Sequence, residues 1–458
     1  MTTPLRIAII GAGPAGIYAG NILWRSGGES GHEVTIDLFD SLPAPYGLIR
    51  YGVAPDHPRI KGIVNSLHEM LDAGTIRFLG NVTYGVDLDL DDLRAHYHAV
   101  IFATGAIRDA RLDIPGIDLP GSFGAADFVS WYDGHPDVPT AWPLDATDVA
   151  VIGNGNVALD VARVLAKHPL DLLSTDIPAN VHAGLEGSPV TDVHVFGRRG
   201  PAQVKFTPIE LRELADLPDV DIVVYPEDFE TLEAEAAQVA GGSNQQKIMT
   251  RILRGWLDRE ETGASRRLHL HFLHSPVEIY GEGRVEGIRF ARTAVGADGS
   301  VRKTDQLVDY PLQAVYRAVG YLGSALPEVP FDEARGIIAN QEGRVIGPDG
   351  AGLYATGWIK RGPVGLIGHT KSDAAETIAH LLADSGTLLK REVGDSDIIE
   401  LLDARGIRFT DWDGWLTLDA HERALGDADP SGVGRERVKM VPRDEQVGIA
   451  RDSALFAR

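Results

Sequence analysis

Short apolar runs that end in glycine-rich turns recur along the chain. The residues from Ile7 to Ile10 are all apolar, as are those from Val149 to Ile152, and such runs are typical of strands buried on both faces. Segments 17–27 and 157–167 follow these runs with the apolar spacing of helices, and a further buried strand is expected within 96–106. Strands that alternate with helices in this way indicate an α/β fold with parallel sheets.

The rest of the pattern is more varied. Proline and glycine are dense over 41–58, which indicates an ordered but irregular segment, and segment 115–145 has the composition of a connection between domains. We further expect helices over 60–73, 206–217 and 372–383, and strands over 34–40, 76–79, 82–84, 193–196, 220–225, 269–272, 277–280, 285–293, 306–311 and 314–321.

Two glycine motifs follow the two apolar runs. They have the spacing G-x-G-x-x-G or G-x-G-x-x-A and comprise Gly11, Gly13 and Gly16 in the first, and Gly153, Gly155 and Ala158 in the second. Such motifs give a tight turn, let the backbone approach a pyrophosphate, and place a helix N-terminus where it attracts phosphate charge. A turn without a ligand is the alternative for one motif alone, whereas two motifs in one chain favour two bound dinucleotides.

The residues that end the next strands indicate which nucleotide each site holds. Asp40 ends the strand after the first motif, where an acid binds a ribose hydroxyl. Arg198 and Arg199 stand at the corresponding place after the second motif, where cations bind a 2′-phosphate, so NADPH is favoured over NADH. A solvated turn is the alternative explanation for the two arginines. The sequence Ala-Thr-Gly at 355–357, ahead of a predicted helix, suits a flavin, because a helix N-terminus stabilises the negative charge of a reduced flavin.

The composition narrows the chemistry further. Cysteine is absent, so the chain carries neither a redox-active disulfide nor thiolate ligands for an iron-sulfur centre, and any electron acceptor is external. The net charge of -23 disfavours nonspecific binding to nucleic acid or to an anionic membrane. The chain enters its first strand directly and has no apolar run of about 18 residues, so we expect a cytoplasmic protein. We expect no metal site.

The order of these motifs resembles the adrenodoxin reductase-like ferredoxin-NADP+ reductases, which are flavoproteins with two dinucleotide sites and include bacterial members. The resemblance covers essentially the whole chain and is carried by GAGPAG at 11–16, PYGLIRYGVAPDHP at 45–58, IGNGNVALDVAR at 152–163, FGRRGP at 196–201, ELREL at 210–214 and GWIKRGPVGLIG at 357–368. It implies two Rossmann-like dinucleotide-binding domains in a glutathione reductase-like architecture. The expected boundaries are 1–106 and 325–458 for the two parts of the FAD-binding domain and 107–324 for the NADP-binding domain.

The resemblance also implies which residues contact the cofactors. FAD is expected at Gly11, Gly13, Ala15, Gly16, Asp40, Leu48, Val82, Trp358, Gly365, Leu366 and Ile367. NADPH is expected at Arg108, Asn154, Gly155, Asn156, Val157, Arg198, Arg199, Glu210 and Gly365. His57 and Glu213 match polar residues near the flavin that are linked to tuning of the redox reaction. Two departures stand out, since relatives usually present Glu at the position of Asp40 and a threonine-first order at His369-Thr370.

The reaction that the resemblance implies is hydride transfer from NADPH to FAD, followed by transfer of single electrons to an iron-sulfur ferredoxin that serves a cytochrome P450 or another metalloenzyme. We expect a monomer. The ferredoxin is expected to dock on a basic face that comprises Arg251, Arg254 and Arg259, with Lys360 and Arg361 as further candidates. The alternative is that the three arginines pair with neighbouring acids such as Asp258 and Glu260.

Two other functions stay open at this point. An NADPH-dependent flavin monooxygenase shares both nucleotide folds, although its F-x-G-x-x-x-H-x-x-x-W signature is missing from the sequence. A noncatalytic subunit that binds FAD and NADPH and passes electrons to a fixed partner belongs to another class. Oxygen-coupled turnover would identify the first, and stable association with a large subunit would identify the second.

Overall fold

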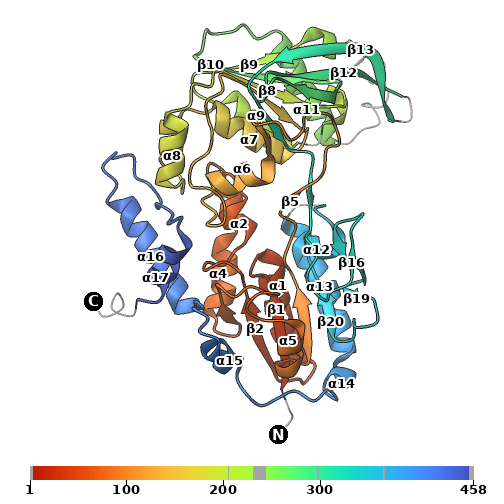
Figure 1. Cartoon of the computed structure of the whole chain (residues 1–458), viewed down its shortest axis with the longest axis vertical. Coiled ribbons are helices and arrows are strands. Elements are labelled where there is room, and N and C mark those ends of the chain that lie inside the picture. The colour runs from red at the N-terminus through yellow and green to blue at the C-terminus, as the bar shows by residue number, and fades with distance from the viewer. Residues whose placement is uncertain (1–3, 205, 231–243, 297–298, 365–366, 453–458) are drawn as a thin grey trace.

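Two large sheets lie in separate halves of the molecule, as a computed structural model of the chain shows (Figure 1). The structure describes residues 4–204, 206–230, 244–296, 299–364 and 367–452. Among these residues, no helix combines the length and the apolar character that a bilayer-spanning segment requires.

The lower sheet in Figure 1 is built around the first apolar run. Strand β1 (Leu5–Ile10) pairs in parallel with β2 (Val34–Phe39) on one side and with β4 (Ala99–Phe102) on the other, so it is covered along both edges. The full order is β18-β19-β20-β4-β1-β2-β3, in which the outer strands are β3 (Arg77–Leu79), β18 (Asn340–Gln341), β19 (Arg344–Val345) and β20 (Leu353–Ala355). The lower sheet is parallel except at β18, β19 and β20, where the pairs β18–β19 and β19–β20 are antiparallel. Helices α1 (Pro14–Glu29) and α13 (Ile367–Ala383) pack against one another over this sheet.

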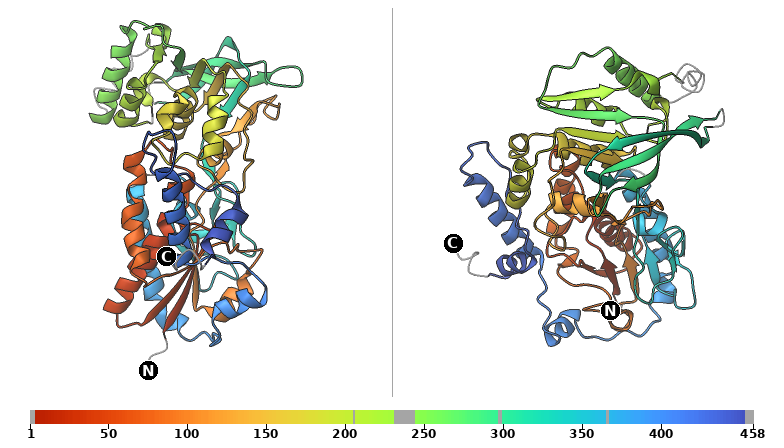
Figure 2. Two further views of the ribbon diagram at one scale, coloured as in Figure 1. Left: turned by 90° about the vertical axis from the view of Figure 1, so that its left-hand side faces the viewer. Right: turned by 45° about the horizontal axis from the view of Figure 1, so that its top comes forward.

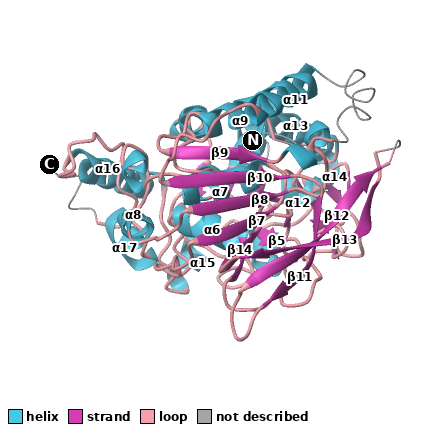
Figure 3. Ribbon diagram, turned by 90° about the horizontal axis from the view of Figure 1, so that it is seen from above, coloured by secondary structure: helices cyan, strands magenta, loops and turns pink. Residues whose placement is uncertain are grey.

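The upper sheet grows from the second apolar run. Strand β7 (Asp148–Ile152) pairs in parallel with β8 (Asp192–Phe196) and β14 (Ala314–Arg317), within the order β6-β14-β7-β8-β10-β9. The remaining strands are β6 (Ser122–Gly124), β9 (Val220–Val224) and β10 (Arg266–His271), and the upper sheet is parallel. Figure 3 shows the strands of this sheet side by side and α11 (Asn244–Leu257) close to its β9 edge. Helices α6 (Ala125–Tyr132), α7 (Asn156–Ala166), α8 (Ala179–Glu186) and α9 (Pro208–Ala215) complete this half.

The two faces of the upper sheet have different partners. Side chains such as Val193 and Leu268 point toward α7, whereas Phe196 faces a second, antiparallel sheet of β11 (His274–Tyr280), β12 (Gly287–Val295) and β13 (Val301–Pro311). Phe196 stacks on Phe290 of that sheet with ring centroids 4.2 Å apart. Because side chains alternate along a strand, residues two apart from Phe196 on β8 meet the same covering sheet.

The halves are joined by short segments that cross between them. Strands β5 (Arg108–Asp109) and β15 (Tyr321–Leu322) pair with each other near the crossing points. They lie just inside the predicted boundaries 106/107 and 324/325, which stay a prediction. The other short elements are α2 (Leu48–Tyr51), α3 (Pro58–Lys61), α4 (Val64–Asp72), α5 (Leu90–His96), α12 (Trp358–Arg361), β16 (Phe331–Asp332), β17 (Ile337–Ile338) and the 3-10 turns Pro169–Leu172, Pro201–Gln203 and Pro226–Asp228.

The C-terminal segment braces both halves. Its helices are α14 (Ser385–Leu388), α15 (Ile398–Ala404), α16 (Trp412–Asp427) and α17 (Arg443–Ala450). In Figure 1, α14 lies at the lower right of the molecule, and α15, α16 and α17 lie on its left, the side that faces the reader in the left view of Figure 2. Buried Glu422 of α16 accepts two hydrogen bonds from the guanidinium of Arg50. The ammonium of Lys439 lies 3.0 Å from an oxygen of Asp176 and donates to the carbonyl of Asp133, and both aspartates belong to the middle of the chain.

Several predicted elements differ from the structure. Segment 115–145, expected as a connection between domains, contributes β6 and α6 to the upper half, and the strand expected over 314–321 is divided into β14 and β15. The helix expected over 60–73 is divided into α3 and α4, and α3 starts earlier, at Pro58, because proline is well placed in a first helical turn. The strand expected over 82–84 does not form, and Tyr84 makes only an isolated bridge with Leu88. Buried Val82 instead donates its backbone N–H to the carbonyl of Asp40.

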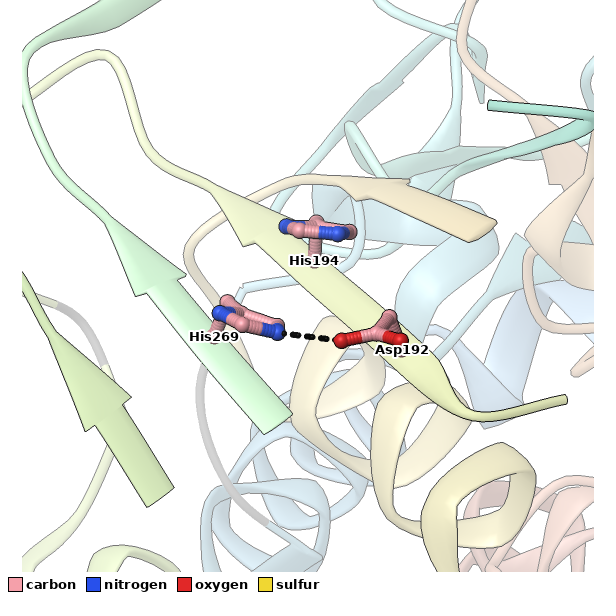
Figure 4. Close-up of side chains that lie close together, drawn as sticks. All are labelled: Asp192, His194 and His269. Atoms are coloured by element: carbon pink, nitrogen blue, oxygen red, sulfur yellow. Dashed lines mark hydrogen bonds and ion pairs between the residues drawn. The ribbon is translucent and has the colours of Figure 1, made fainter. Parts of the chain in front are cut away.

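Stacked imidazole rings lie between the upper sheet and the sheet that covers it. Asp192, His194 and His269 bring their ligand atoms within 4.8 Å of one another (Figure 4), but the two rings are nearly parallel, with an interplanar angle of 12°. A metal ion lies close to the plane of each imidazole that binds it, and parallel rings share no such position. Asp192 is already engaged, since His269 Nε2 lies 2.9 Å and Arg267 Nε 2.7 Å from its Oδ1. The arrangement is therefore a packed hydrogen-bond network.

These imidazoles make the upper half sensitive to acid. Burial, together with neighbouring His194 and His274, holds the pKa of His271 well below its usual range. The unfolded chain binds this proton near pH 6.5, whereas the folded chain does not, so unfolding is favoured as the pH falls below that value. In His271→Phe an aromatic ring still stacks on Phe196, but the titrating imidazole is gone. When the pH is lowered from about 6.5 to about 5, we expect the free energy of unfolding to fall by about 2 kcal/mol less in this variant than in the wild type.

Urea unfolding of both proteins at the two pH values checks this expectation. The difference between the two proteins isolates His271, since all other titrating groups are shared. An identical pH dependence in the two proteins would contradict it.

Candidate nucleotide-binding sites

The first glycine motif lies where β1 meets α1. Gly11 has a φ of 110°, and a Cβ there would lie 2.5 Å from the carbonyl oxygen of Ala103 at the end of β4. A Cβ on Gly16 would lie 2.0 Å from the carbonyl oxygen of Gly11. Both positions therefore exclude a side chain, because strand, turn and helix approach too closely.

The helix ends behind the two glycine motifs are open toward a ligand. Helix α1 begins after Gly13 and helix α7 after Gly155, and neither has a side-chain cap or an acid in its first turn. By contrast, α5 and α9 carry capping boxes built on Asp89 and Thr207. Uncapped N–H groups and the positive end of the helix dipole form a site for phosphate, and the chain leaves these two long helices in that state.

Asp40 lies beside the first glycine turn. Its Oδ2 accepts the N–H of Ala12 at 2.7 Å and its Oδ1 accepts the N–H of Leu42 at 2.9 Å. Burial raises the pKa of Asp40 to about 6, although both hydrogen bonds oppose that shift. The structure thus shows Asp40 fastening the turn to the end of β2, and its contact with a ribose stays a prediction.

Several of the other predicted FAD residues come together around α1. Gly357 has a φ of 75°, and a Cβ there would lie 2.6 Å from the Cβ of Ala15. The backbone just before Trp358 therefore lies against α1. Leu48 begins α2, Val82 lies beside Asp40, and Ile367 begins α13. Gly365 and Leu366 lie outside the described residues.

A cavity of about 690 Å³ lies at the second glycine motif. It is lined by the four predicted residues from Asn154 to Val157 and by Arg198 and Arg199. Three buried polar atoms of its wall have no hydrogen-bond partner, namely Asn154 Nδ2, Asn156 Oδ1 and Gln203 Oε1. Buried polar atoms without partners indicate a polar ligand, so the donor set fits a pyridine nucleotide.

Two residues predicted to contact NADPH, Arg108 and Glu210, do not line this cavity, and their contacts with the nucleotide stay predictions. Arg108 is exposed and reaches only the carbonyl of Gly323, at 3.4 Å. Glu210 accepts the N–H of Thr207 at 2.7 Å and forms the capping box of α9. Conversely, Gln203, His274 and Lys303 line the cavity without having been predicted. Gln203 follows the two arginines closely, whereas the other two come from distant strands that carry no local motif.

His57 lies at the boundary between the two halves. Its Nε2 is 2.8 Å from Asp160 Oδ1 on α7, and its Nδ1 is 3.3 Å from Glu213 Oε2 on α9. Burial lowers the pKa of His57, but the hydrogen bond and charge of Asp160 outweigh it, so the pKa is raised. The two predicted modulators, His57 and Glu213, are therefore brought into contact by the fold.

A chain of buried charges continues from this contact. Arg163 Nη2 lies 2.8 Å from Asp56 Oδ1 and 2.9 Å from Asp160 Oδ1, and Lys167 reaches the other oxygen of Asp56 at 3.1 Å. Despite burial, the two cations hold the pKa of Asp56 below its usual range. Asp56 precedes His57 in the lower half, whereas Arg163 belongs to the upper half, so this ion pair joins the halves beside His57.

The candidate docking residues divide into two groups. Arg251 and Arg254 lie on the exposed face of α11 with Lys247, opposite its buried residues Met249, Leu253 and Trp256. We call Lys247, Arg251 and Arg254 the α11 basic face. Across the described ranges, these residues and exposed Arg259 form no ion pair, so the alternative pairing with Asp258 and Glu260 is not observed.

Of the other two candidates, Lys360 was predicted wrongly, whereas a docking role for Arg361 stays a prediction. Lys360 is buried, with its ammonium 2.5 Å from Glu376 and 3.1 Å from Asp373, and it is therefore not available to a partner. Arg361 is partly buried and lies 3.5 Å from Asp373. Their sequence neighbourhood resembled an exposed basic loop, but the acids that neutralise them come from α13.

The contact between His57 and Asp160 can be tested by titration. We expect Asp160→Asn to lower the pKa of His57 by about 1 unit or more, because it removes the acceptor whose charge outweighs burial. NMR titration of the His57 ring measures this shift. Glu213→Gln is the matched control, and it should shift the pKa less, since that carboxylate is farther away and more exposed. A His57 pKa that responds more to the Glu213 variant would contradict the assignment.

Comparison with known proteins agrees with this geometry. Residues 5–175 match the family model for pyridine nucleotide-disulphide oxidoreductases. The NADPH-ferredoxin reductase FprA of Mycobacterium tuberculosis is 40% identical over 97% of this chain and 99% of its own length. Human mitochondrial NADPH:adrenodoxin oxidoreductase is 37% identical over 97% of this chain and 91% of its own.

A solved structure gives the same result in three dimensions. Mycobacterium tuberculosis FprA in complex with NADPH superimposes with a TM-score of 0.91 at 39% identity, over 98% of this chain and 100% of that one. The two glycine motifs, the two large sheets and the contact at His57 thus occur in a chain that belongs to the adrenodoxin reductase-like family of ferredoxin reductases, with two Rossmann-like domains.

Proposed function

We propose that this protein transfers electrons from NADPH through bound FAD to a small iron-sulfur ferredoxin. The observation that carries the proposal is the cavity at the second glycine motif, where the uncapped end of α7, unpaired Asn154 and Asn156, and the cations Arg198 and Arg199 converge. This donor set matches the pyrophosphate and 2′-phosphate of NADPH. The names of the relatives, which refer to NADPH and to ferredoxin or adrenodoxin, support the same reaction.

The first glycine motif fits FAD. The uncapped end of α1 would hold the pyrophosphate. Gly357, the residue before Trp358, lies against Ala15 of α1, and α13 packs against the same helix. When bound, FAD supplies the exchange of one hydride for two single electrons. Asp160 raises the pKa of buried His57 through its hydrogen bond and its charge, at the boundary of the halves and within the segment 45–58.

The acceptor is a separate protein in this proposal. The chain has no cysteine, so it cannot pass electrons to an internal disulfide or to a thiolate-bound cluster. Among the residues that the structure describes, the α11 basic face has no ion-pair partner on a strongly acidic chain. Helix α11 packs against α9, which carries Glu213 next to His57. An acidic ferredoxin would therefore be attracted to the vicinity of the redox site.

Finer points remain predictions. These are assignment to the ferredoxin-NADP+ reductase class, service to a cytochrome P450, the monomeric state and the cytoplasmic location. The FAD contacts of Gly365 and Leu366 fall outside the described residues.

Cytochrome c reduction tests the proposal directly. With NADPH and an added ferredoxin we expect strong ferredoxin dependence and a KM for NADPH well below that for NADH. Arg198→Gln combined with Arg199→Gln should raise the KM for NADPH by about 100-fold and leave the KM for NADH nearly unchanged, because the variant loses two charged donors to one phosphate.

Other outcomes point to the rival functions. Substrate-dependent oxygen consumption without ferredoxin dependence would indicate a flavin monooxygenase. Binding of both nucleotides without turnover until a large partner is added would indicate an electron-transfer subunit.

Charge reversal tests the α11 basic face. We expect Arg251→Glu with Arg254→Glu to raise the KM for ferredoxin at least about tenfold at low salt, with NADPH reduction of the flavin intact. Stopped-flow absorbance measures flavin reduction, and steady-state assays measure the KM. Arg25→Glu with Arg408→Glu is the matched control, since both residues are exposed in the lower half and the change in net charge is the same. Equal effects of the two double variants would rule out a local docking site.

A further inference from the structure

The covering sheet β11–β13 forms one wall of the pyridine nucleotide cavity. Ser275 and Pro276 of β11 and Lys303 of β13 line it together with Arg198 and Arg199. The glycine motifs do not predict this wall, because the three antiparallel strands are inserted between β10 and β14 of the parallel sheet and fold back over it. The cavity is therefore lined by cationic side chains from two elements, namely the turn after β8 and strand β13.

Lys303 is tied to the position of the two arginines by a short path. Its neighbour across the ladder is Thr293 of β12, whose hydroxyl donates to the carbonyl of Arg198 at 2.7 Å. The N–H of Leu273 donates to the carbonyl of Arg199 at 3.2 Å, and the N–H of Thr293 donates to the carbonyl of Leu273 at 2.8 Å. The backbone of the arginine turn and the backbone of the covering sheet are thus held in fixed register.

The ammonium of Lys303 uses only one of its three hydrogen-bond donors within the ranges that the structure describes. It donates one hydrogen bond to the carbonyl of Pro276, at 3.1 Å, at the rim of the cavity. Over the described part of the chain it forms no ion pair, although acids outnumber basic residues by 66 to 43 in the whole sequence. A lysine has three donors, so two remain for a ligand. Lys303 and Arg198 are exposed, so water screens the repulsion among the three cations, and an anion bound in the cavity would be attracted by all of them.

We propose that Lys303 is a third cationic contact for the 2′-phosphate of NADPH and that it contributes to the choice of NADPH over NADH. This inference rests on the proposed function, since it requires the 2′-phosphate to lie at Arg198 and Arg199. The arginines would bind phosphate oxygens through their planar forks, whereas Lys303 would add a point charge from the covering sheet. NADH lacks the phosphate, so the contribution of Lys303 is confined to the phosphorylated nucleotide.

Binding of nucleotide fragments tests the inference. We expect Lys303→Met to weaken 2′,5′-ADP binding about tenfold in calorimetry of the flavin-loaded protein and to leave 5′-AMP binding unchanged. The KM for NADPH should rise by a similar factor while the KM for NADH stays the same. Lys303→Arg should restore most of the affinity. Arg302→Met is the matched control, because it removes the same charge from the next residue of β13, which points to the other face.

The outcomes separate this inference from the proposed function. If the wild type binds 2′,5′-ADP no better than 5′-AMP, the proposed function itself fails. If Arg198→Gln loses the preference and Lys303→Met keeps it, only the role of Lys303 is overturned. Equal losses of 2′,5′-ADP and 5′-AMP affinity in Lys303→Met would also overturn it, because they would indicate a structural effect on the cavity.

Discussion

The ion pair between Asp56 and Arg163 is the interaction on which the arrangement of the halves depends. It is buried on both sides, and Arg163 simultaneously contacts Asp160, which holds His57. Losing one member of a buried pair leaves the other charge without compensation, which costs roughly 3–5 kcal/mol. One guanidinium therefore links the junction of the halves to the acid that holds His57.

Helix α7 connects this ion pair to the nucleotide cavity. Its first turn faces the cavity, Asp160 lies one turn farther along, and Arg163 follows three residues later. A helix is stiff over this length, so the position of the pyridine nucleotide and the position of the His57 contact are set by one rigid element. The first turn of α7 at the nucleotide cavity, the contact of Asp160 with His57 and the ion pair of Arg163 between the halves thus belong to a single helix.

Sequence patterns correctly predicted those parts of the fold that are determined by neighbouring residues along the chain. The apolar runs at β1 and β7, the glycine turns after them and the arginine pair after β8 were all recovered, because strand burial and turn geometry constrain those residues directly. The partners of Lys360, by contrast, come from α13, and Lys303 reaches the cavity only because an antiparallel sheet folds over it. Such contacts depend on tertiary placement, which no spacing within one segment encodes. The capping role of Glu210 was missed for a different reason, since T-x-x-E at 207–210 is itself a local capping signal.

The C-terminal segment has a consequence for how such proteins can be recombined. Glu422 neutralises Arg50 of the lower half, and Lys439 neutralises Asp176 of the upper half, although both lie near the end of the chain. An exchange of the NADP-binding domain alone between two relatives would pair a foreign Asp133–Asp176 region with the resident Lys439. Hybrids should therefore be cut so that segment 429–443 travels with the middle of the chain, and the natural unit of exchange is discontinuous in sequence.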